Sequence, residues 1–263
     1  MNFTKMHGLG NDYLYHFGEL ENAEELAIKL SDRHFGIGSD GIITISESEI
    51  ADFRMRIYNA DGSEAMMCGN GIRCVGKYVY DKGYTKQTEL TVETKSGVKR
   101  LHLEIADQKV VRAKVEMGTA VVEEKKQLEV QGETVVCRPV SMGNPHAVIF
   151  VKHGELDKVY TLGKRIENHE EFPGGVNVEF VEVIDTDHLR MRVWERGSGI
   201  TMACGTGACA STAAAIADGL CRANVPVQVE LDGGSLEITI DDRYQVQMIG
   251  PAQTICECEV AVG

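Results

Sequence analysis

Apolar and polar positions alternate along much of the chain, which is the pattern of half-buried strands. From residue 101 to 117 the alternation runs on both sides of Ala106-Asp107-Gln108, and this predicts a β-hairpin. In the second half, apolar residues alternate in the same way between residues 227 and 248, with breaks at Gly233-Gly234 and Asp241-Asp242. Further strands are expected at residues 3–6, 14–17, 42–45 and 54–59. The chain is therefore predicted to contain many strands in both halves.

Helical spacing of apolar residues is confined to a few segments. Residues 21–34 have apolar positions three and four apart, acidic residues early and Arg33 late, as an amphipathic helix requires. Residues 72–80, after Cys68, carry an apolar stripe, and Gly83 supplies a stop. A weaker helix is expected between residues 157 and 168.

One unit of this pattern occurs twice. Cys68-Gly69-Asn70-Gly71 returns as Cys204-Gly205-Thr206-Gly207, 136 residues later, and the strand before it returns at the same offset. The Gly-Asn turn at Asn11 recurs at Asn144, and the loop at residues 35–41 recurs at 172–177. Two similar domains are therefore predicted, one comprising residues 1–117 and 252–263 and the other residues 118–251.

Composition narrows the class of protein. The 263 residues are 43% hydrophobic and have a formal net charge of −13, without an extended cluster of Lys and Arg, so nucleic acid is not an expected partner. No apolar run approaches the roughly 20 residues of a membrane helix, and the first residues do not form a secretion signal. A globular cytoplasmic protein with no membrane partner is expected.

The duplicated cysteines are the strongest candidates for chemistry. Each is followed by Gly-x-Gly and a helical stretch, so each thiol should lie at a helix N-terminus, where backbone N–H groups lower a thiol pKa from about 8.5. The same N–H groups, from Gly69, Asn70, Gly205 and Thr206, are suited to hold a carboxylate. The other cysteines, Cys74, Cys137, Cys209, Cys221, Cys256 and Cys258, are expected to be structural.

A pair of thiols can invert a carbon centre if one removes a proton from one face and the other returns a proton to the opposite face. The intermediate carbanion needs an electron sink or donors aimed at its carboxylate, and helix termini supply the donors. No pyridoxal lysine is assigned, and no cofactor is expected. A metal is not expected either, because no Cys-x-x-Cys pair occurs.

Other polar residues have two interpretations each. His7 and His146, in the twin Gly-Asn turns, could bond their own loops or contact a substrate. Glu195-Arg196 could be a surface ion pair, but its position before the second thiol, matching Asn59 before the first, favours ligand contacts.

Taken together, these motifs resemble the diaminopimelate epimerase family over essentially the whole chain. The resemblance is carried by residues 7–12, 36–41, 59–64, 68–74, 143–146, Asn177, 195–197 and 203–208. It implies an α+β fold of two pseudo-symmetric domains, each a mixed sheet curled into a barrel-like layer around a central helix. It also implies that a final strand at residues 254–262 returns to the first domain, and that the protein is a homodimer.

The resemblance further implies an activity and a site. The activity is cofactor-independent interconversion of LL- and meso-2,6-diaminopimelate in lysine and peptidoglycan precursor synthesis, with Cys68 and Cys204 as the acid/base pair. His146 is expected to support the site. The substrate-binding residues implied are Asn11, Asn59, Gly69, Asn70, Asn144, Asn177, Glu195, Arg196, Gly205 and Thr206. At Gly41 some members have a larger polar residue, so the contact it would make is not carried over.

Two alternatives remain at this point. A racemase or epimerase of another amino acid, such as proline or hydroxyproline, would use the same thiols but would not need Glu195-Arg196 to bind the distal end of its substrate. A thiol redox or zinc-binding module would instead predict disulfide exchange or stoichiometric metal.

Overall fold

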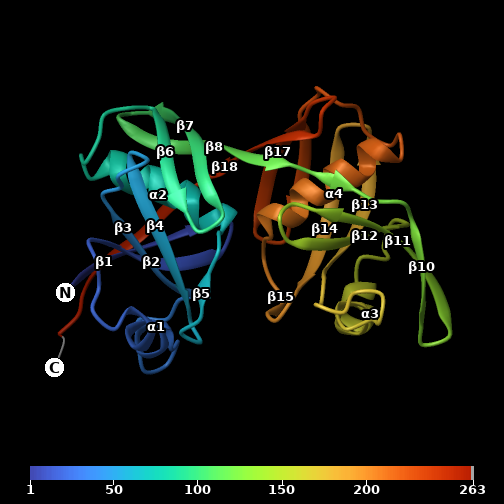
Figure 1. The fold of residues 1–263 in the computed structure, drawn as a ribbon, viewed down its shortest axis with the longest axis horizontal. Coiled ribbons are helices and arrows are strands. Elements are labelled where there is room, and N and C mark those ends of the chain that lie inside the picture. Colours follow the sequence, from blue (N-terminus) through green and yellow to red (C-terminus); the bar gives the residue numbers. More distant parts are fainter. Residues whose placement is uncertain (262–263) are drawn as a thin grey trace. The chain divides into compact units, whose positions relative to one another are not determined.

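The computed structural model describes residues 1–261, and in it the chain forms two compact units. The first comprises Met1–Val115 and the described residues from Gly250 onward, and the second comprises Glu116–Ile249. Each unit has one long buried helix, one shorter helix and a mixed sheet (Figure 1).

In the first unit the strands form a continuous mixed ladder. Its helices are α1 (Ala23–Ser31) and α2 (Gly69–Asp81), and its strands are β1 (Asn2–Gly8), β2 (Asn11–Phe17), β3 (Gly41–Ser46), β4 (Phe53–Asn59), β5 (Glu64–Ala65), β6 (Glu89–Thr94), β7 (Gly97–Ala106), β8 (Lys109–Thr119) and β19 (Gln253–Glu259). The order of pairing is β19-β1-β2-β3-β4-β6-β7-β8. The pairs β2–β3 and β4–β6 are parallel and the others antiparallel.

The second unit repeats this order. Its helices are α3 (Lys158–Glu167) and α4 (Gly205–Ala217), and its strands are β9 (Val121–Val122), β10 (Lys126–Val130), β11 (Glu133–Ser141), β12 (Pro145–Val151), β13 (Asn177–Asp185), β14 (His188–Glu195), β15 (Gly199–Ile200), β16 (Val227–Leu231), β17 (Gly234–Ile240) and β18 (Gln245–Pro251). The boundaries between the two units fall within β8 and β18. Its ladder runs β11-β12-β13-β14-β16-β17-β18, with β12–β13 and β14–β16 parallel. The parallel pairs occupy equivalent places in the two units, as a duplication requires.

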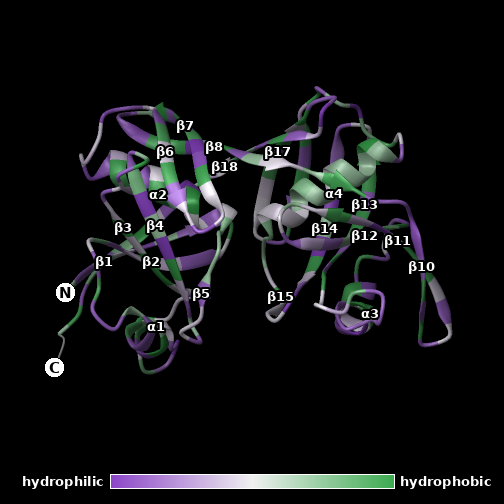
Figure 2. Ribbon diagram, viewed as in Figure 1, coloured by the Kyte–Doolittle hydropathy of each residue, from purple (hydrophilic) through white to green (hydrophobic). Residues whose placement is uncertain are grey.

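The helices α2 and α4 are buried around most of their circumference. Every residue of α2 from Gly69 to Val79 is buried, and α4 is buried from Ala208 to Ala215. Figure 2 shows α4 white to green along its length, as expected of a helix surrounded by protein. The predicted fold of a mixed sheet around a central helix is confirmed in each unit.

The predicted elements are present: α1 and α3 are shorter than predicted, and α2 extends beyond the predicted residues 72–80 at both ends. The hairpin over residues 101–117 is β7–β8, and Gly83, with φ of 81°, follows the end of α2 as predicted. The pattern of residues 118–132 was too weak to predict β9 and β10, which are short strands at the margin of the second sheet. The final strand is β19 and ends at Glu259 rather than at residue 262; residues 262 and 263 lie outside the described residues.

Candidate active site

The two duplicated thiols occupy the same backbone position in their units. Cys68 and Cys204 are the N-caps of α2 and α4, both with extended backbone. The Cys68 Sγ accepts a hydrogen bond from the Gly71 N–H at 3.3 Å, and the Cys204 Sγ accepts one from the Gly207 N–H at 3.4 Å. The prediction that each thiol lies at a helix N-terminus is confirmed.

Glycine at the third helical position lets the helix begin close against packed side chains. A Cβ at Gly71 would lie 2.7 Å from the Ile43 Cδ1, and one at Gly207 would lie 2.8 Å from the Glu179 Oε1 and 3.3 Å from the Cys204 Sγ. In α4 the missing side chain therefore leaves space for both a carboxylate and the thiol.

Cys68 is partly buried among amides and aromatic rings. Its thiol donates to the Asn11 Oδ1 at 3.3 Å, and the Asn70 Nδ2 donates to the same oxygen at 3.4 Å. Burial raises the pKa of Tyr13, beside this thiol, well above its ordinary value. The structure thus places three of the predicted residues, Cys68, Asn11 and Asn70, in contact.

Cys204 is 5% exposed and lies among carboxylates. Its burial raises its pKa well above the ordinary value, and the neighbouring Glu195 and Glu179 raise it further. The expectation of a lowered pKa is therefore wrong for this thiol in this structure. The hydrogen bonds from the Thr206 hydroxyl and the Gly207 N–H act in the opposite direction but are outweighed.

A buried histidine and glutamate stand beside the second thiol. The Nδ1 of His146 lies 2.7 Å from the Glu179 Oε1, and its Nε2 lies 3.1 Å from the Asn144 Oδ1. The amide oxygen can only accept, so Nε2 donates, and Nδ1 then either donates to a carboxylate or accepts from a carboxylic acid. In both arrangements the His146–Glu179 pair carries no net charge, which suits a site from which water is excluded.

Glu195 and Arg196 have different surroundings. The Glu195 carboxylate accepts from the Thr201 hydroxyl at 2.5 Å and lies beside Cys204, and burial raises its pKa. Arg196 is exposed, and its guanidinium donates to the Gly174 carbonyl at 3.2 Å. No ion pair joins the two side chains among residues 1–261, so the surface-pair interpretation is not supported.

The two asparagines at the strand ends are held by their own loops. Asn59, at the end of β4, donates to the Ser63 hydroxyl at 3.0 Å. Asn177, at the start of β13, donates to the Pro145 carbonyl at 2.9 Å and accepts from the Arg196 N–H at 3.0 Å.

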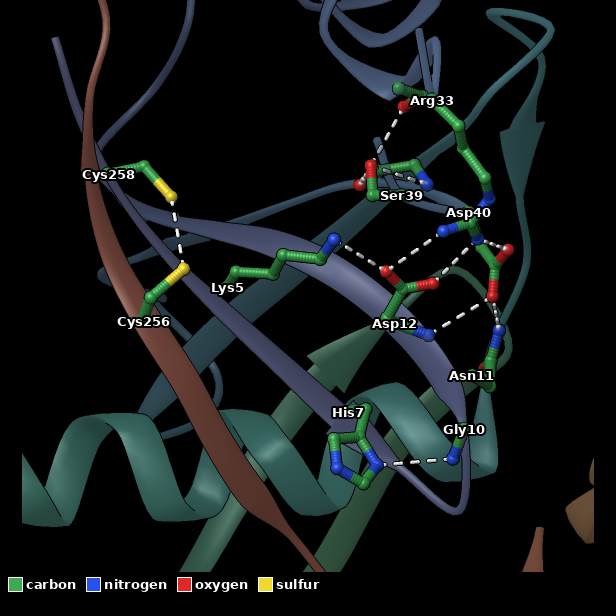
Figure 3. A network of polar contacts seen from close by, with 12 residues as sticks. Lys5, His7, Gly10, Asn11, Asp12, Arg33, Ser39, Asp40, Cys256 and Cys258 are labelled. Atoms are coloured by element: carbon green, nitrogen blue, oxygen red, sulfur yellow. Dashed lines mark hydrogen bonds and ion pairs between the residues drawn. The ribbon is translucent and has the colours of Figure 1, made fainter. Parts of the chain in front are cut away.

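The expected roles of the remaining cysteines are mostly supported. Cys74, Cys137, Cys209 and Cys221 are buried, and burial raises the pKa of Cys74 to about 11. Cys256 differs, because it is exposed on β19 with its Sγ 3.6 Å from that of Cys258 (Figure 3). In residues 1–261 no group of three or more His, Cys, Asp or Glu side chains has the arrangement of a metal site.

Three residues near the thiols were not predicted as site residues. Glu179 lies between apolar residues of β13 and is completely buried, so an acid flanked by apolar residues in a strand was the signal available. Thr201 and Tyr13 gave no such signal, since both are ordinary strand or turn residues in the sequence.

No helix among residues 1–261 has both the length and the apolar character needed to cross a lipid bilayer.

Comparison with known proteins matches almost all of the chain to one family. The family described as diaminopimelate epimerase matches residues 3–123 and 138–255. A relative named diaminopimelate epimerase from Acetivibrio thermocellus is 48% identical over 99% of this chain and 98% of its own length. One of the same name from Parabacteroides distasonis is 50% identical over 97% of this chain and 96% of its own length.

A solved structure with the same fold is more distant in sequence. The probable proline racemase from Agrobacterium radiobacter has a TM-score of 0.75 and 18% identity, with 100% of this chain and 93% of that one covered. At this identity the similarity establishes the fold alone, and the fold does not distinguish one amino-acid substrate from another.

Proposed function

Because the chain belongs to the diaminopimelate epimerase family, we propose that it interconverts LL- and meso-2,6-diaminopimelate without a cofactor, in the synthesis of lysine and peptidoglycan precursors. The observation that carries the mechanism is the duplicated helix N-cap, with one thiol at the start of α2 and one at the start of α4. We further propose that each compact unit is one half of the epimerase, and that the enzyme is a cytoplasmic homodimer.

The proposed reaction is a proton transfer at one carbon. One thiolate removes the α-proton, the electrons of the C–H bond pass to the carbanion and its carboxylate, and the opposite thiol returns a proton to the other face. Cys68 and Cys204 have these roles, and they exchange them in the reverse direction. The proposal requires both sulfurs to reach opposite faces of the same α-carbon.

The carbanion is stabilised through its carboxylate. The first N–H groups of a helix have no partner within the helix, and the positive end of the dipole lies there. We assign the backbone of Gly69, Asn70, Gly205 and Thr206 to this carboxylate, with His146 supporting the second thiol. The other substrate contacts are assigned to Asn11, Asn59, Asn144, Asn177, Glu195 and Arg196.

The function is tested by proton NMR of the reduced protein, freed of metal and cofactor, with LL-2,6-diaminopimelate in deuterium oxide. The expected result is loss of the α-proton signal together with appearance of the meso isomer. If the reduced, folded protein exchanges no α-proton of this substrate, the proposed function is wrong, and proline and hydroxyproline are the next substrates to try.

Substrate class is tested at Arg196. The side chain is exposed and is assigned to the distal carboxylate of diaminopimelate, a charge-assisted contact that a simple amino acid could not make. Arg196→Met is expected to lower kcat/KM for diaminopimelate at least about tenfold. Arg222→Met removes another exposed arginine of the same unit and is the matched control. Equal kinetics in the two variants would contradict the assigned clamp.

A further inference from the structure

The side-chain amide of Asn11 is held at both ends. Its Nδ2 donates to the Asp40 Oδ2 at 2.6 Å, while its Oδ1 accepts from the Cys68 thiol at 3.3 Å (Figure 3 shows the Asp40 side). A side-chain amide has one end that donates hydrogen bonds and one end that accepts them. The group bound at one end of the Asn11 amide therefore fixes whether the thiol at the other end meets a donor or an acceptor.

Asp40 selects which end of the amide faces it. An ionised carboxylate only accepts hydrogen bonds, so it binds the NH₂ end and turns the oxygen toward the thiol. Asp40 is itself fixed, since its Oδ1 accepts from the Arg33 Nη2 at 2.9 Å and its Oδ2 from the Asp12 N–H at 3.1 Å. In Figure 3 these side chains converge on Asp40 beside the turn of Gly10 and Asn11.

A second contact enforces the same orientation from α2. The completely buried Arg73 donates from its Nη2 to the Asn70 Oδ1 at 3.0 Å, which leaves the Asn70 Nδ2 directed at the Asn11 Oδ1 at 3.4 Å. The guanidinium has no acceptor atom, so it can bind only the oxygen end of the Asn70 amide and fixes the orientation of that amide. Asp40 fixes the orientation of the Asn11 amide in the same way.

From this geometry we propose that Asp40 is a positioning residue that makes Asn11 present a hydrogen-bond acceptor to Cys68, and so favours the protonated thiol at this position. This inference rests on the proposed function, in which a protonated thiol is the acid that returns a proton to the substrate. A hydrogen bond to the neutral form of an acid disfavours its ionisation, and the Asn11 oxygen can bond only the neutral thiol.

The second unit orients its equivalent asparagine the other way. The Asn144 Oδ1 accepts from His146 Nε2, and its Nδ2 donates to the Thr206 hydroxyl at 3.3 Å, which in turn lies 3.5 Å from the Cys204 Sγ. The amide NH₂ is therefore on the thiol side. The duplicated halves thus present opposite amide ends toward their thiols, and in the first unit the carboxylate of Asp40 selects that end.

Other ionisable groups of the first unit lie near Cys68 and are the same in every variant proposed below. Tyr13 and Tyr15 face it from β2, and Cys74 and Arg73 belong to α2. Burial raises the pKa of both tyrosines, so they stay neutral and contribute dipoles rather than charge.

The test measures the protonation of Cys68 directly. The full-length protein is alkylated with iodoacetamide between about pH 6 and 10, and modification at Cys68 is followed by peptide mass spectrometry. Asp40→Asn lets either end of the Asn11 amide face position 40, so the pH midpoint of alkylation is expected to fall by about 0.5–1 unit. Asp12→Asn removes a neighbouring carboxylate that also pairs with Arg33 but does not touch the Asn11 side chain. It is expected to leave the midpoint unchanged.

A double-variant cycle separates the amide from the electric field of the carboxylate. In an Asn11→Ala background, Asp40→Asn should no longer move the midpoint. An equal shift in Asp12→Asn, a shift that persists without Asn11, or no shift in Asp40→Asn would each overturn the proposal. If Asp40→Asn lacks a cooperative thermal transition, Asp40→Ala removes the same acceptor and takes its place. The alkylation measurement does not depend on turnover. A failure of the Asp40 proposal can therefore be told apart from a failure of the proposed function, which the NMR experiment tests.

Discussion

Two cysteines with the same backbone conformation have different chemical surroundings. Cys68 contacts the amide of Asn11 and is partly buried, whereas Cys204 is buried beside Glu195. Both accept one N–H from the first turn of the following helix. The duplicated backbone therefore fixes where each thiol lies, and the side chains around each sulfur affect its pKa.

Replacing either thiol by a hydroxyl is expected to remove most of the activity. A serine at position 68 or 204 is a far weaker acid than cysteine and cannot be replaced by the thiol on the opposite face. Cys68→Ser and Cys204→Ser should each lower kcat at least about 10²-fold, measured by the appearance of meso-diaminopimelate. The exposed Cys256→Ser is the control. Near-normal turnover in either of the first two variants would contradict the two-base assignment.

At the scale of elements, the thiol that caps α4, Cys204, lies beside a buried carboxylate from β13, Glu179. Gly207 supplies the N–H that bonds the Cys204 sulfur and leaves room for the Glu179 oxygen. The backbone of the first turn of α4 therefore approaches the Cys204 sulfur closely and holds it by a hydrogen bond.

A methyl group at Gly207 is expected to disturb the site more than the fold. Its carbon would lie 2.8 Å from the Glu179 Oε1, so the carboxylate and the thiol must move. Gly207→Ala should lower kcat/KM at least about tenfold, because small misplacement of catalytic groups is costly. Gly76→Ala in α2 is the comparison, since its methyl would meet Leu101 and Leu103 of β7. It should reduce the melting temperature without a matching loss of kcat/KM per folded protein. The same kinetic loss in both variants would indicate a general effect of helix strain.

Glu64, on the short strand β5, is paired with two basic side chains, and its pKa is lower in the folded protein than in the unfolded chain. Arg56 on β4 and Lys95 bond Glu64, and these hydrogen bonds lower its pKa from 4.5 to about 2. Since the folded pKa is the lower one, the stabilisation is complete above about pH 4.5 and is lost as the pH falls toward about 2.

Glu64→Gln should therefore destabilise the protein only where the carboxylate is ionised. The expected loss at pH 7 is about 0.5–1 kcal/mol, reduced by the solvent exposure of both cationic partners. The difference from the unsubstituted protein should shrink as the pH falls below about 4.5 in urea unfolding experiments. Glu89→Gln, at an exposed position of β6, should show no such pH dependence. A difference that is constant with pH would indicate a packing effect.

At the scale of the whole molecule, the proposed mechanism requires two units to act on one carbon. Each unit carries one thiol on its central helix, and neither contains both. In the proposed mechanism, therefore, neither unit is active alone, and the whole chain is needed to supply both thiols.

Mild oxidation is expected to inactivate the enzyme reversibly. In the proposed mechanism the two thiols flank one carbon, and an oxidant can join such a pair with loss of two protons and two electrons; dithiothreitol would reverse the reaction. Peptide mass spectrometry should then find a Cys68–Cys204 crosslink, while Cys256→Ser removes the competing pair on β19. Activity that survives oxidation of the free thiols, or inactivation without this crosslink, would count against the proposed mechanism.

Local sequence was enough to predict the repeated strand, turn, thiol and helix. Alternation located the hairpin β7–β8, and Cys-Gly-x-Gly located the starts of α2 and α4, because these features depend on residues adjacent in the chain. The short strands β9 and β10 were missed, since their pairing rather than their own pattern makes them strands.

The sequence by itself determined the family, the two-fold repetition and the position of both thiols on their helices. Only the tertiary structure decided their surroundings. The pKa of Cys204 is raised rather than lowered because the thiol is itself buried and, secondly, because Glu195 of β14 and Glu179 of β13 lie beside it. Asp40 reaches Asn11 from 29 residues away. Burial and charge act through space, so the acidity of a group depends on neighbours that no local pattern can identify.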